Sequence, residues 1–199
     1  SQRVQDKMLK FDKIVYIIRD PRDTLISQAH FLYAKHMSQF DGAVTKTPTQ
    51  HISEQLHQAT RKWVKHVASY LMLSLLSPDQ VKIIFYEQLR EHFTDTVHEL
   101  SLFLDLTTDP ADIAAIAEAT SFQNLQQITG QHLRIGTSNQ WVTDLSPVQQ
   151  AEVLRVAGPM LDILGYPQKN PATRPLPKLP TLIVREQLHV ARRTAMRRT

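Results

Sequence analysis

The chain contains no cysteine, which excludes a disulfide framework, a thiolate metal site and a cysteine nucleophile. No apolar stretch is long enough to span a bilayer, and no signal peptide is visible. Glycine is scarce, with only five residues: Gly42, Gly130, Gly136, Gly158 and Gly165. None of them lies in a glycine-rich loop of the kind that cradles a phosphate with backbone amides.

Length and composition are those of one soluble globular domain. At 199 residues the chain can bury one sizeable core, and its 42% apolar and 21% charged content is ordinary. The nine histidines are scattered, and pairs such as His30 and His36 do not lie one helical turn apart, as two zinc ligands would. We therefore expect no metal site.

The net charge of +4 comes from the last fifteen residues. This segment sets a single acid, Glu186, against five arginines: Arg185, Arg192, Arg193, Arg197 and Arg198. The rest of the chain is nearly neutral, which argues against a nucleic-acid-binding face over the whole domain. We interpret the segment as a solvated basic helix end that complements the helix dipole. The alternative is a binding surface for an anionic partner.

The segment 13–31 is the most informative part of the chain. Its β-branched run at 14–18, with one tyrosine, is typical of a strand buried on both faces of a parallel sheet. The run stops at Arg19, after which Asp20 is suited to cap a helix and Pro21 to occupy its first position. The segment therefore predicts a strand, a tight turn and a helix.

An arginine at the carboxyl end of such a strand lies where open α/β sheets bind their ligands. The guanidinium of Arg19 and the hydroxyl of Ser27 are suited to hold a phosphate through charged hydrogen bonds. In the alternative interpretation, Arg19 only pairs with Asp20 or Asp23 at the start of the helix.

Further elements follow from apolar spacing and capping signals. Helical spacing predicts helices over 51–76 and 89–104, and Val81 to Tyr86 has the composition of a second buried strand. Asp109 and Pro110 begin a shorter helix by the same logic as the first.

A last helix is predicted from the capping box of Ser146 and Gln149 to Gly165. Gly158 and Pro159 should kink or split it. We divide the chain into three parts: an α/β domain over 1–166, a proline-rich connector over 167–180 and a basic helical tail over 181–199.

The order of strand, two helices, strand and further helices predicts an α/β fold with a parallel sheet flanked by helices. We expect the strands near 13–18 and 81–85 to be parallel and adjacent or one strand apart. Arg19 and Tyr86 should then lie at the same edge of the sheet.

The segment 13–31 resembles the 3′-phosphate-binding segment of the cytosolic-type sulfotransferases. In that family an apolar strand is followed by Arg, then Asp or Asn, Pro, a basic residue, Asp, and a Ser eight positions after the Arg. Arg19 and Ser27 have this spacing. These enzymes transfer a sulfuryl group from 3′-phosphoadenosine 5′-phosphosulfate (PAPS) to an alcohol or amine. The resemblance implies a P-loop-kinase-like fold, PAPS as co-substrate, adenosine 3′,5′-bisphosphate as product, a small-molecule or glycan acceptor and a cytoplasmic location.

Two further segments are similar to the adenine-binding parts of this family. The run 83–89 resembles its second strand, whose tyrosine, here Tyr86, lies near the adenine; the alternative is a tyrosine that fills the core. Thr120, Ser121 and Phe122 match the residues that pack and hydrogen-bond around the adenine, since a flat apolar ring and a hydroxyl suit a purine.

A later segment resembles the Arg-Lys-Gly loop that closes over the 3′-phosphate in the family. Arg134 and Gly136 match, whereas Ile135 replaces the usual lysine, and Asn-Gln at 139–140 replaces Gly-Asp before Trp141. The loss of one charged contact, typically about 1.5–3 kcal/mol, predicts weaker nucleotide binding than is usual in the family.

The chain lacks the Lys-Ser-Gly-Thr-Thr loop with which the family binds the 5′-phosphosulfate. The lysine of that loop stabilises the leaving oxygen, and the catalytic base lies between the loop and the segment that opens this chain. We therefore expect both groups upstream of Ser1, an N-terminally incomplete fold, and no sulfotransferase activity from the 199 residues alone. The catalytic residues are unknown from this sequence.

We interpret the chain as the 3′-phosphate and adenine half of a PAPS-dependent sulfotransferase. The first alternative is a non-catalytic, degenerate relative that binds nucleotide or serves as a scaffold. The second is an anion- or nucleic-acid-binding protein that uses the basic tail, which a steep salt dependence of binding would reveal. The sequence specifies neither the acceptor nor the oligomeric state.

Overall fold

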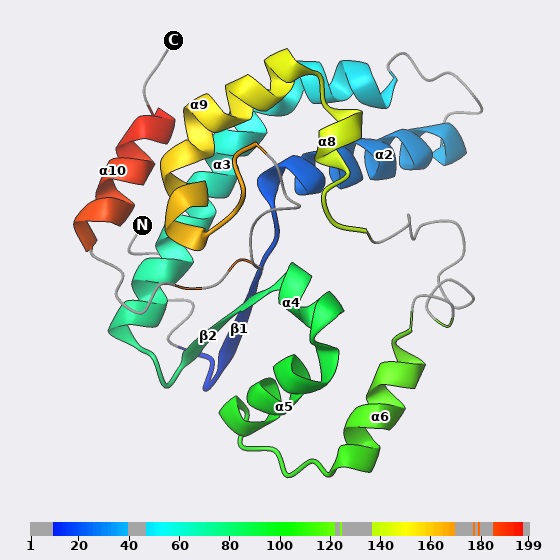
Figure 1. The fold of residues 1–199 in the computed structure, drawn as a ribbon, viewed down its shortest axis with the longest axis vertical. Helices are drawn as coiled ribbons and strands as arrows, with labels where there is room; N and C mark the ends of the chain where they lie inside the picture. The colour runs from blue at the N-terminus through cyan, green and yellow to red at the C-terminus, as the bar shows by residue number, and fades with distance from the viewer. Residues whose placement is uncertain are drawn as a thin grey trace.

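The computed structural model describes residues 10–39, 47–121, 124, 137–169, 177, 179 and 185–196. In this part of the chain two strands, β1 (Ile14–Ile18) and β2 (Val81–Phe85), form a parallel pair. The register sets Ile18 against Phe85, so both strands end at the same edge (Figure 1). The prediction of two adjacent parallel strands flanked by helices is confirmed.

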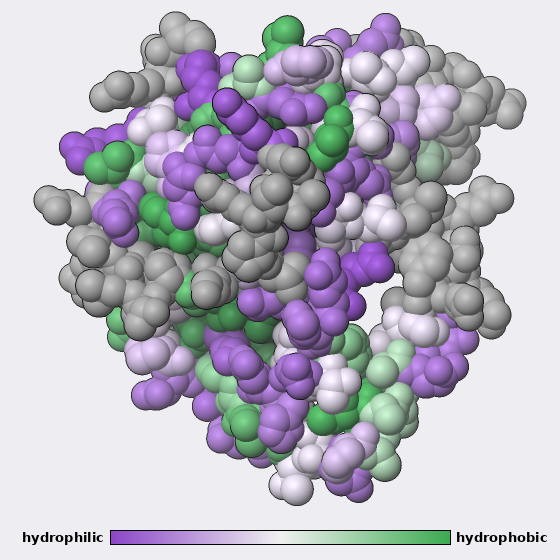
Figure 2. Space-filling model, in the orientation of Figure 1, coloured by the Kyte–Doolittle hydropathy of each residue, from purple (hydrophilic) through white to green (hydrophobic). Residues whose placement is uncertain are grey.

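β1 is less buried than its sequence predicts. Ile18 is buried, but the Ile17 side chain is 50% exposed, whereas both faces of β2 carry buried residues. One element that covers β2 is α5 (Phe93–Phe103), which packs on it. Figure 2 shows a largely hydrophilic side of the molecule, with apolar side chains reaching the surface over the sheet and over α5.

The helix α2 (Pro21–Gln39) begins where the sequence predicts. The Asp20 side chain accepts the amide N–H of Arg22 at 2.9 Å, and the Asp20 carbonyl accepts the amide of Thr24 at 2.9 Å. These two bonds satisfy donors that every helix start exposes. The capped turn therefore places the start of α2 directly at the end of β1 (Figure 1).

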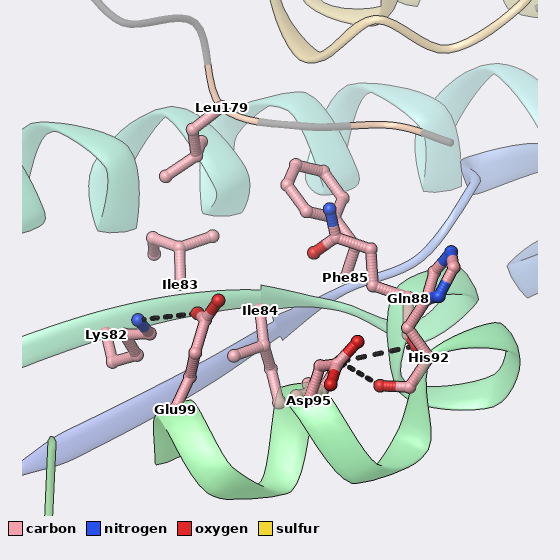
Figure 3. Close-up of a pocket in the computed structure, with 10 residues that line it drawn as sticks. Lys82, Ile83, Ile84, Phe85, Gln88, His92, Asp95, Glu99 and Leu179 are labelled. Carbon is pink, nitrogen blue, oxygen red and sulfur yellow. Dashed lines mark hydrogen bonds and ion pairs between the residues drawn. The ribbon is translucent and has the colours of Figure 1, made fainter. Parts of the chain in front are cut away.

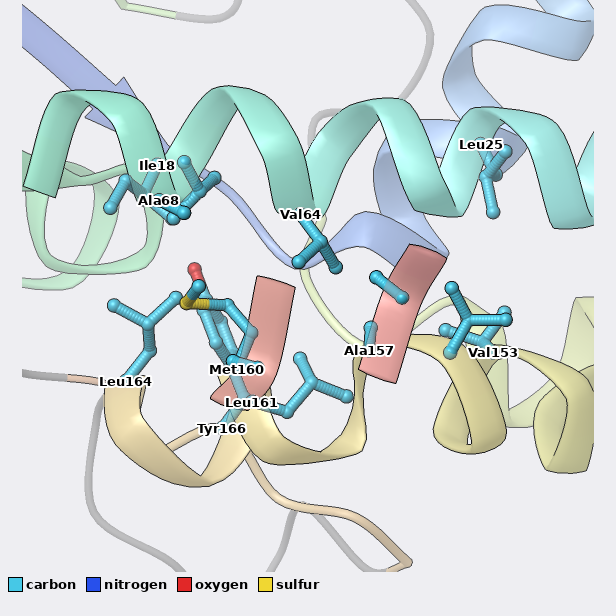
Figure 4. Packing of buried hydrophobic residues seen from close by; sticks show 14 of the residues in the cluster. Ile18, Leu25, Val64, Ala68, Val153, Ala157, Met160, Leu161, Leu164 and Tyr166 are labelled. Carbon is cyan, nitrogen blue, oxygen red and sulfur yellow. The ribbon is translucent and has the colours of Figure 1, made fainter. Parts of the chain in front are cut away.

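The long helix α3 (Pro48–Leu76) is central to the fold. It packs against α2, β2, α9 (Pro147–Leu164) and α10 (Arg185–Met196). It begins before the predicted residue 51, because Thr47 and Gln50 form a capping box around Pro48. Figure 4 shows the buried core between α3 and α9.

The helices α9 and α10 complete this core. The sequence predicted a kink or a split at Gly158 and Pro159; α9 is not split there, and α3 and α10 pack along it. α9 ends at Gly165, whose φ of 76° is left-handed. α10 adds three buried residues to the core: Leu188, Ala191 and Ala195. The three-part division of the chain stays a prediction.

Short helices follow β2: α4 (Tyr86–Glu91), α5 and α6 (Pro110–Ala119), and later the single turn α8 (Trp141–Asp144). The helix expected over 89–104 is thus two helices that separate at His92. Asp109 caps α6 as predicted. Among the described helices, none has the length and apolar character needed to cross a membrane.

Candidate nucleotide-binding site

Arg19 and Tyr86 meet at the carboxyl ends of the two strands, as predicted. The guanidinium carbon of Arg19 lies 4.4 Å from the centroid of the Tyr86 ring, which is a cation–π contact. The Arg19 carbonyl accepts a hydrogen bond from the Trp63 indole at 3.1 Å. α3 thus fixes the backbone at this edge, and Tyr86 orients the guanidinium.

The guanidinium of Arg19 keeps unused donor capacity. Its Nη2 donates a long hydrogen bond to the carbonyl of Thr137 at 3.3 Å. Its Nε is buried and has no hydrogen-bond partner within the described residues. Because a buried donor without an acceptor costs free energy, this atom marks a place where a ligand oxygen would be favourable.

The carboxylates that follow Arg19 are engaged elsewhere. Asp20 pairs with Arg22 through two hydrogen bonds, Nε to Oδ1 at 2.9 Å and Nη2 to Oδ2 at 2.6 Å. Asp23 accepts two backbone amides from a distant segment. Within the part of the chain that the structure describes, no salt bridge joins Arg19 to either aspartate. The interpretation of Arg19 as a helix-start ion pair is therefore not supported.

Arg22 is fully buried, which the sequence analysis did not foresee. Its Nη2 also donates to the Pro167 carbonyl at 2.6 Å, and its guanidinium carbon lies 3.6 Å from the centroid of the Trp141 ring. A charged residue in the first turn of a helix usually faces solvent. The one sequence signal for its burial is its position four residues after Ile18, the last residue of a strand expected to be buried.

Glu87 joins the two strand ends to the chain that follows α9. Its carboxylate accepts the amide of Asp20 at 3.2 Å and the hydroxyl of Tyr166 at 2.9 Å. Burial raises the pKa of Glu87 and of Tyr166 above their ordinary values. These bonds were not predicted, because they connect residues far apart in the sequence.

Asp23 fastens the segment 139–141 to the start of α2. Its two carboxylate oxygens accept the amide N–H of Asn139 at 2.6 Å and that of Trp141 at 3.0 Å. Burial and the nearby charge of Asp20 raise the pKa of Asp23 to about 6, although the two amide bonds and Arg19 oppose this shift.

Asn139 adopts a left-handed backbone conformation, with φ of 66°. Glycine enters this region most readily, and asparagine is among the few other residues that do so routinely. Asparagine is therefore compatible with the backbone conformation at this position, where the resemblance implies glycine.

The structure brings only some of the predicted site residues together. Ser27 is half-buried on α2, four residues beyond Asp23 and on the same stripe. Thr120 and Ser121 follow α6, which packs on α5 and lies apart from the strand ends in Figure 1. The Thr120 hydroxyl donates to the carbonyl of Ile116 at 2.7 Å. Three predicted site residues lie outside the described residues: Phe122, Arg134 and Gly136.

A separate cavity of about 380 Å³ runs along β2 (Figure 3). Its lining includes the apolar residues Ile83 and Leu179, and an ion pair between Lys82 Nζ and Glu99 Oε2 at 3.1 Å. None of the predicted site residues that the structure describes lines this cavity. It is therefore distinct from the edge where Arg19 and Tyr86 meet.

Comparison with known proteins assigns the chain to a family. Residues 5–155 match the family model of the sulfotransferase domain, which is well over half of the chain. The chain therefore belongs to the sulfotransferase domain family, and the resemblance inferred from its sequence is confirmed.

Two relatives and one solved structure show the extent of the similarity. Sulfotransferase 2A2 of Rattus norvegicus is 26% identical over 160 residues, which cover 70% of this chain and 53% of that protein. Cytosolic sulfotransferase 15 of Arabidopsis thaliana is 26% identical over 178 residues, covering 77% and 46%. The crystal structure of mouse sulfotransferase SULT7A1 complexed with PAP is 22% identical, with a TM-score of 0.58, and covers 78% of this chain and 61% of that one. This likeness confirms the sulfotransferase fold. The chain spans about half the length of the curated relatives it matches.

Proposed function

We propose that this chain holds the adenosine 3′-phosphate in a PAPS-dependent sulfotransferase, with Arg19 as the principal contact. The observation that carries the proposal is the Arg19 guanidinium, which stacks on Tyr86 while its buried Nε has no acceptor among the described residues. Membership of the sulfotransferase domain family supports the choice of ligand. So does the PAP complex of a protein with the same fold.

The residues at this edge fit a phosphate ester of a nucleoside. A guanidinium presents its donors as a planar fork that matches two phosphate oxygens. Ser27, half-buried on α2, is proposed to add a hydroxyl donor. The remaining assignments are proposed from the family resemblance: Tyr86, Thr120, Ser121 and Phe122 at the adenine, and Arg134 and Gly136 over the phosphate.

The proposed reaction transfers the sulfuryl group of PAPS to a hydroxyl or amine of a small-molecule or glycan acceptor in the cytoplasm. The bond from sulfur to the phosphate oxygen breaks as a bond from sulfur to the acceptor forms, and the acceptor proton passes to a base. The described residues bind and orient the nucleotide, and we assign none of them to the base.

Isothermal titration calorimetry with adenosine 3′,5′-bisphosphate tests this proposal. We expect Arg19→Ala to weaken binding by roughly tenfold to a hundredfold, because each charged hydrogen bond to phosphate contributes about 1.5–3 kcal/mol. Adenosine 5′-monophosphate, which lacks the 3′-phosphate, should bind wild type and variant equally. Arg19→Lys should recover only part of the loss, since it keeps the charge without the planar fork.

Arg192→Ala is the matched control, because Arg192 is an exposed arginine of the basic α10. It removes the same charge and should leave the affinity unchanged. Equal affinity of wild type and Arg19→Ala would show that Arg19 is structural. A loss with Arg192→Ala instead would favour anion binding by the C-terminal segment.

A further inference from the structure

Arg19 and the first turn of α2 are tied by four contacts to a segment more than a hundred residues later. Arg19 Nη2 donates to the carbonyl of Thr137, the Asp23 carboxylate accepts two amides at 139–141, and the Arg22 guanidinium stacks on the Trp141 ring. Thr137 follows Arg134 by three residues in the sequence. The residues proposed to cover the 3′-phosphate therefore come just before a segment that α2 holds in place.

Asp23 makes the strongest of these ties. It is only 2% exposed, and each of its carboxylate oxygens accepts one amide. Hydrogen bonds from amides to an ionised carboxylate are roughly twice as strong as neutral ones. One of these bonds holds Asn139, whose backbone is left-handed. This conformation is unfavourable for most residues, so the bond to Asp23 helps to maintain it.

We propose that Asp23 is a positioning residue whose ionised carboxylate holds the segment 137–141 against the end of β1 and thereby sets the nucleotide affinity of the Arg19 site. The inference builds on the proposed function, because the affinity in question is for the 3′-phosphate. Asp23 acts through backbone amides and through the Thr137 carbonyl that Arg19 contacts, and it does not itself touch the ligand.

Protonation gives this tie a pH dependence. Protonation removes the negative charge and makes one oxygen a hydroxyl, which is a much weaker acceptor, so the bonds to the two amides weaken. The pKa of Asp23 is raised to about 6, so the carboxylate is ionised above that pH, and the tie weakens as the pH falls through 6.

Several charged groups surround Asp23. Asp20 raises the pKa of Asp23 and Arg19 lowers it. Asp23 in turn interacts electrostatically with Tyr166, in the chain after α9. The carboxylate of Glu87, on α4, accepts the backbone amide of Asp20. Asp20 pairs with Arg22, and Asp23 is the carboxylate that accepts the amides of the distant segment.

The test compares wild type with Asp23→Asn by titration with adenosine 3′,5′-bisphosphate between pH 5 and pH 8. Asparagine keeps one acceptor oxygen but carries no charge, so it imitates the protonated state at every pH. We expect affinity about tenfold weaker at pH 7.5 and a shallower pH profile. The ligand's own phosphate titrates near pH 6, and this slope is common to both proteins. Asp79→Asn, at an exposed aspartate, is the control and should match wild type.

A second readout needs no nucleotide. In nuclear magnetic resonance spectra, the amide signals of Asn139 and Trp141 should shift with a midpoint near pH 6 in wild type and stay flat in Asp23→Asn. Equal affinities and parallel pH profiles in the two proteins, with Arg19→Ala still weaker, would overturn the role of Asp23 and leave the proposed function standing. No binding by wild type would overturn both.

Discussion

At the scale of single residues, two neighbouring arginines with similar sequence contexts have opposite surroundings. Arg22 is fully buried and its donors meet Asp20 and the carbonyl of Pro167, whereas Arg19 keeps a buried Nε without an acceptor among the described residues. The first arrangement completes the fold, and the second leaves capacity for a ligand. This contrast is why we assign ligand binding to Arg19 and a structural role to Arg22.

We expect Arg22→Met to lower the free energy of unfolding by about 3–5 kcal/mol, because it leaves Asp20 as a buried charge without its partner. The double variant Arg22→Met, Asp20→Asn should recover part of the loss, since asparagine is uncharged and still caps a helix. Urea unfolding monitored by circular dichroism measures both.

Arg155→Met provides the control for this prediction. Arg155 pairs with Glu152 near the surface, where the arginine side chain is 44% exposed, so its removal should change the free energy of unfolding far less than the removal of Arg22. Similar losses from Arg22→Met and Arg155→Met would contradict the importance of the buried pair.

At the scale of elements, α9 shows how packing overrides a local helix breaker. Gly158 and Pro159 both disfavour a helix interior, yet α9 continues through them between α3 and α10. A methyl group built on Gly158 would meet no atom within 4 Å outside the helix's own neighbouring backbone. This glycine is therefore not required for close approach of another element.

Gly158→Ala should raise the free energy of unfolding by about 0.5–1 kcal/mol, because alanine loses less backbone entropy when it enters a helix. Gly165→Ala is the contrasting variant and should be destabilising, by roughly 1–2 kcal/mol, because φ at this position is 76°. Thermal unfolding of the two variants and of wild type measures both changes in the free energy of unfolding. Destabilisation by Gly158→Ala would mean that the site is tighter than its geometry indicates.

At the scale of the whole molecule, the proposed site concerns nucleotide binding, and we assign none of the described residues to the transfer step. None of the chain's five glycines lies in a glycine-rich loop of the kind that binds a phosphosulfate. The proposed contacts concern the 3′-phosphate and the adenine. We therefore expect this chain to bind the nucleotide without transferring a sulfuryl group.

We expect the purified 199-residue chain to bind adenosine 3′,5′-bisphosphate but to show no sulfotransferase activity. Removal of a single group that stabilises transition-state charge commonly costs two to three powers of ten in rate. The measurement is transfer from labelled PAPS to a panel of phenols, alcohols and amines, with a sulfotransferase of known activity as positive control. Turnover at an ordinary enzymatic rate by this chain would show that it contains catalytic groups we have not identified.

Local signals in the sequence were sufficient for much of the fold. The β-branched runs predicted β1 and β2, and the residues Asp20, Asp109 and Ser146 predicted three helix starts, because capping depends on neighbours a few positions away. The same locality explains why the division at His92 of the helix expected over 89–104 was missed.

The sequence by itself determined the family, the parallel strand pair and the meeting of Arg19 with Tyr86, since parallel strands that feed helices must end at one edge. Only the tertiary structure decided which charges are buried and what they bind. Arg22, Asp23 and Glu87 contact residues 67 or more positions away. No local pattern specifies such partners, because burial and hydrogen bonding between distant segments exist only once the chain has packed.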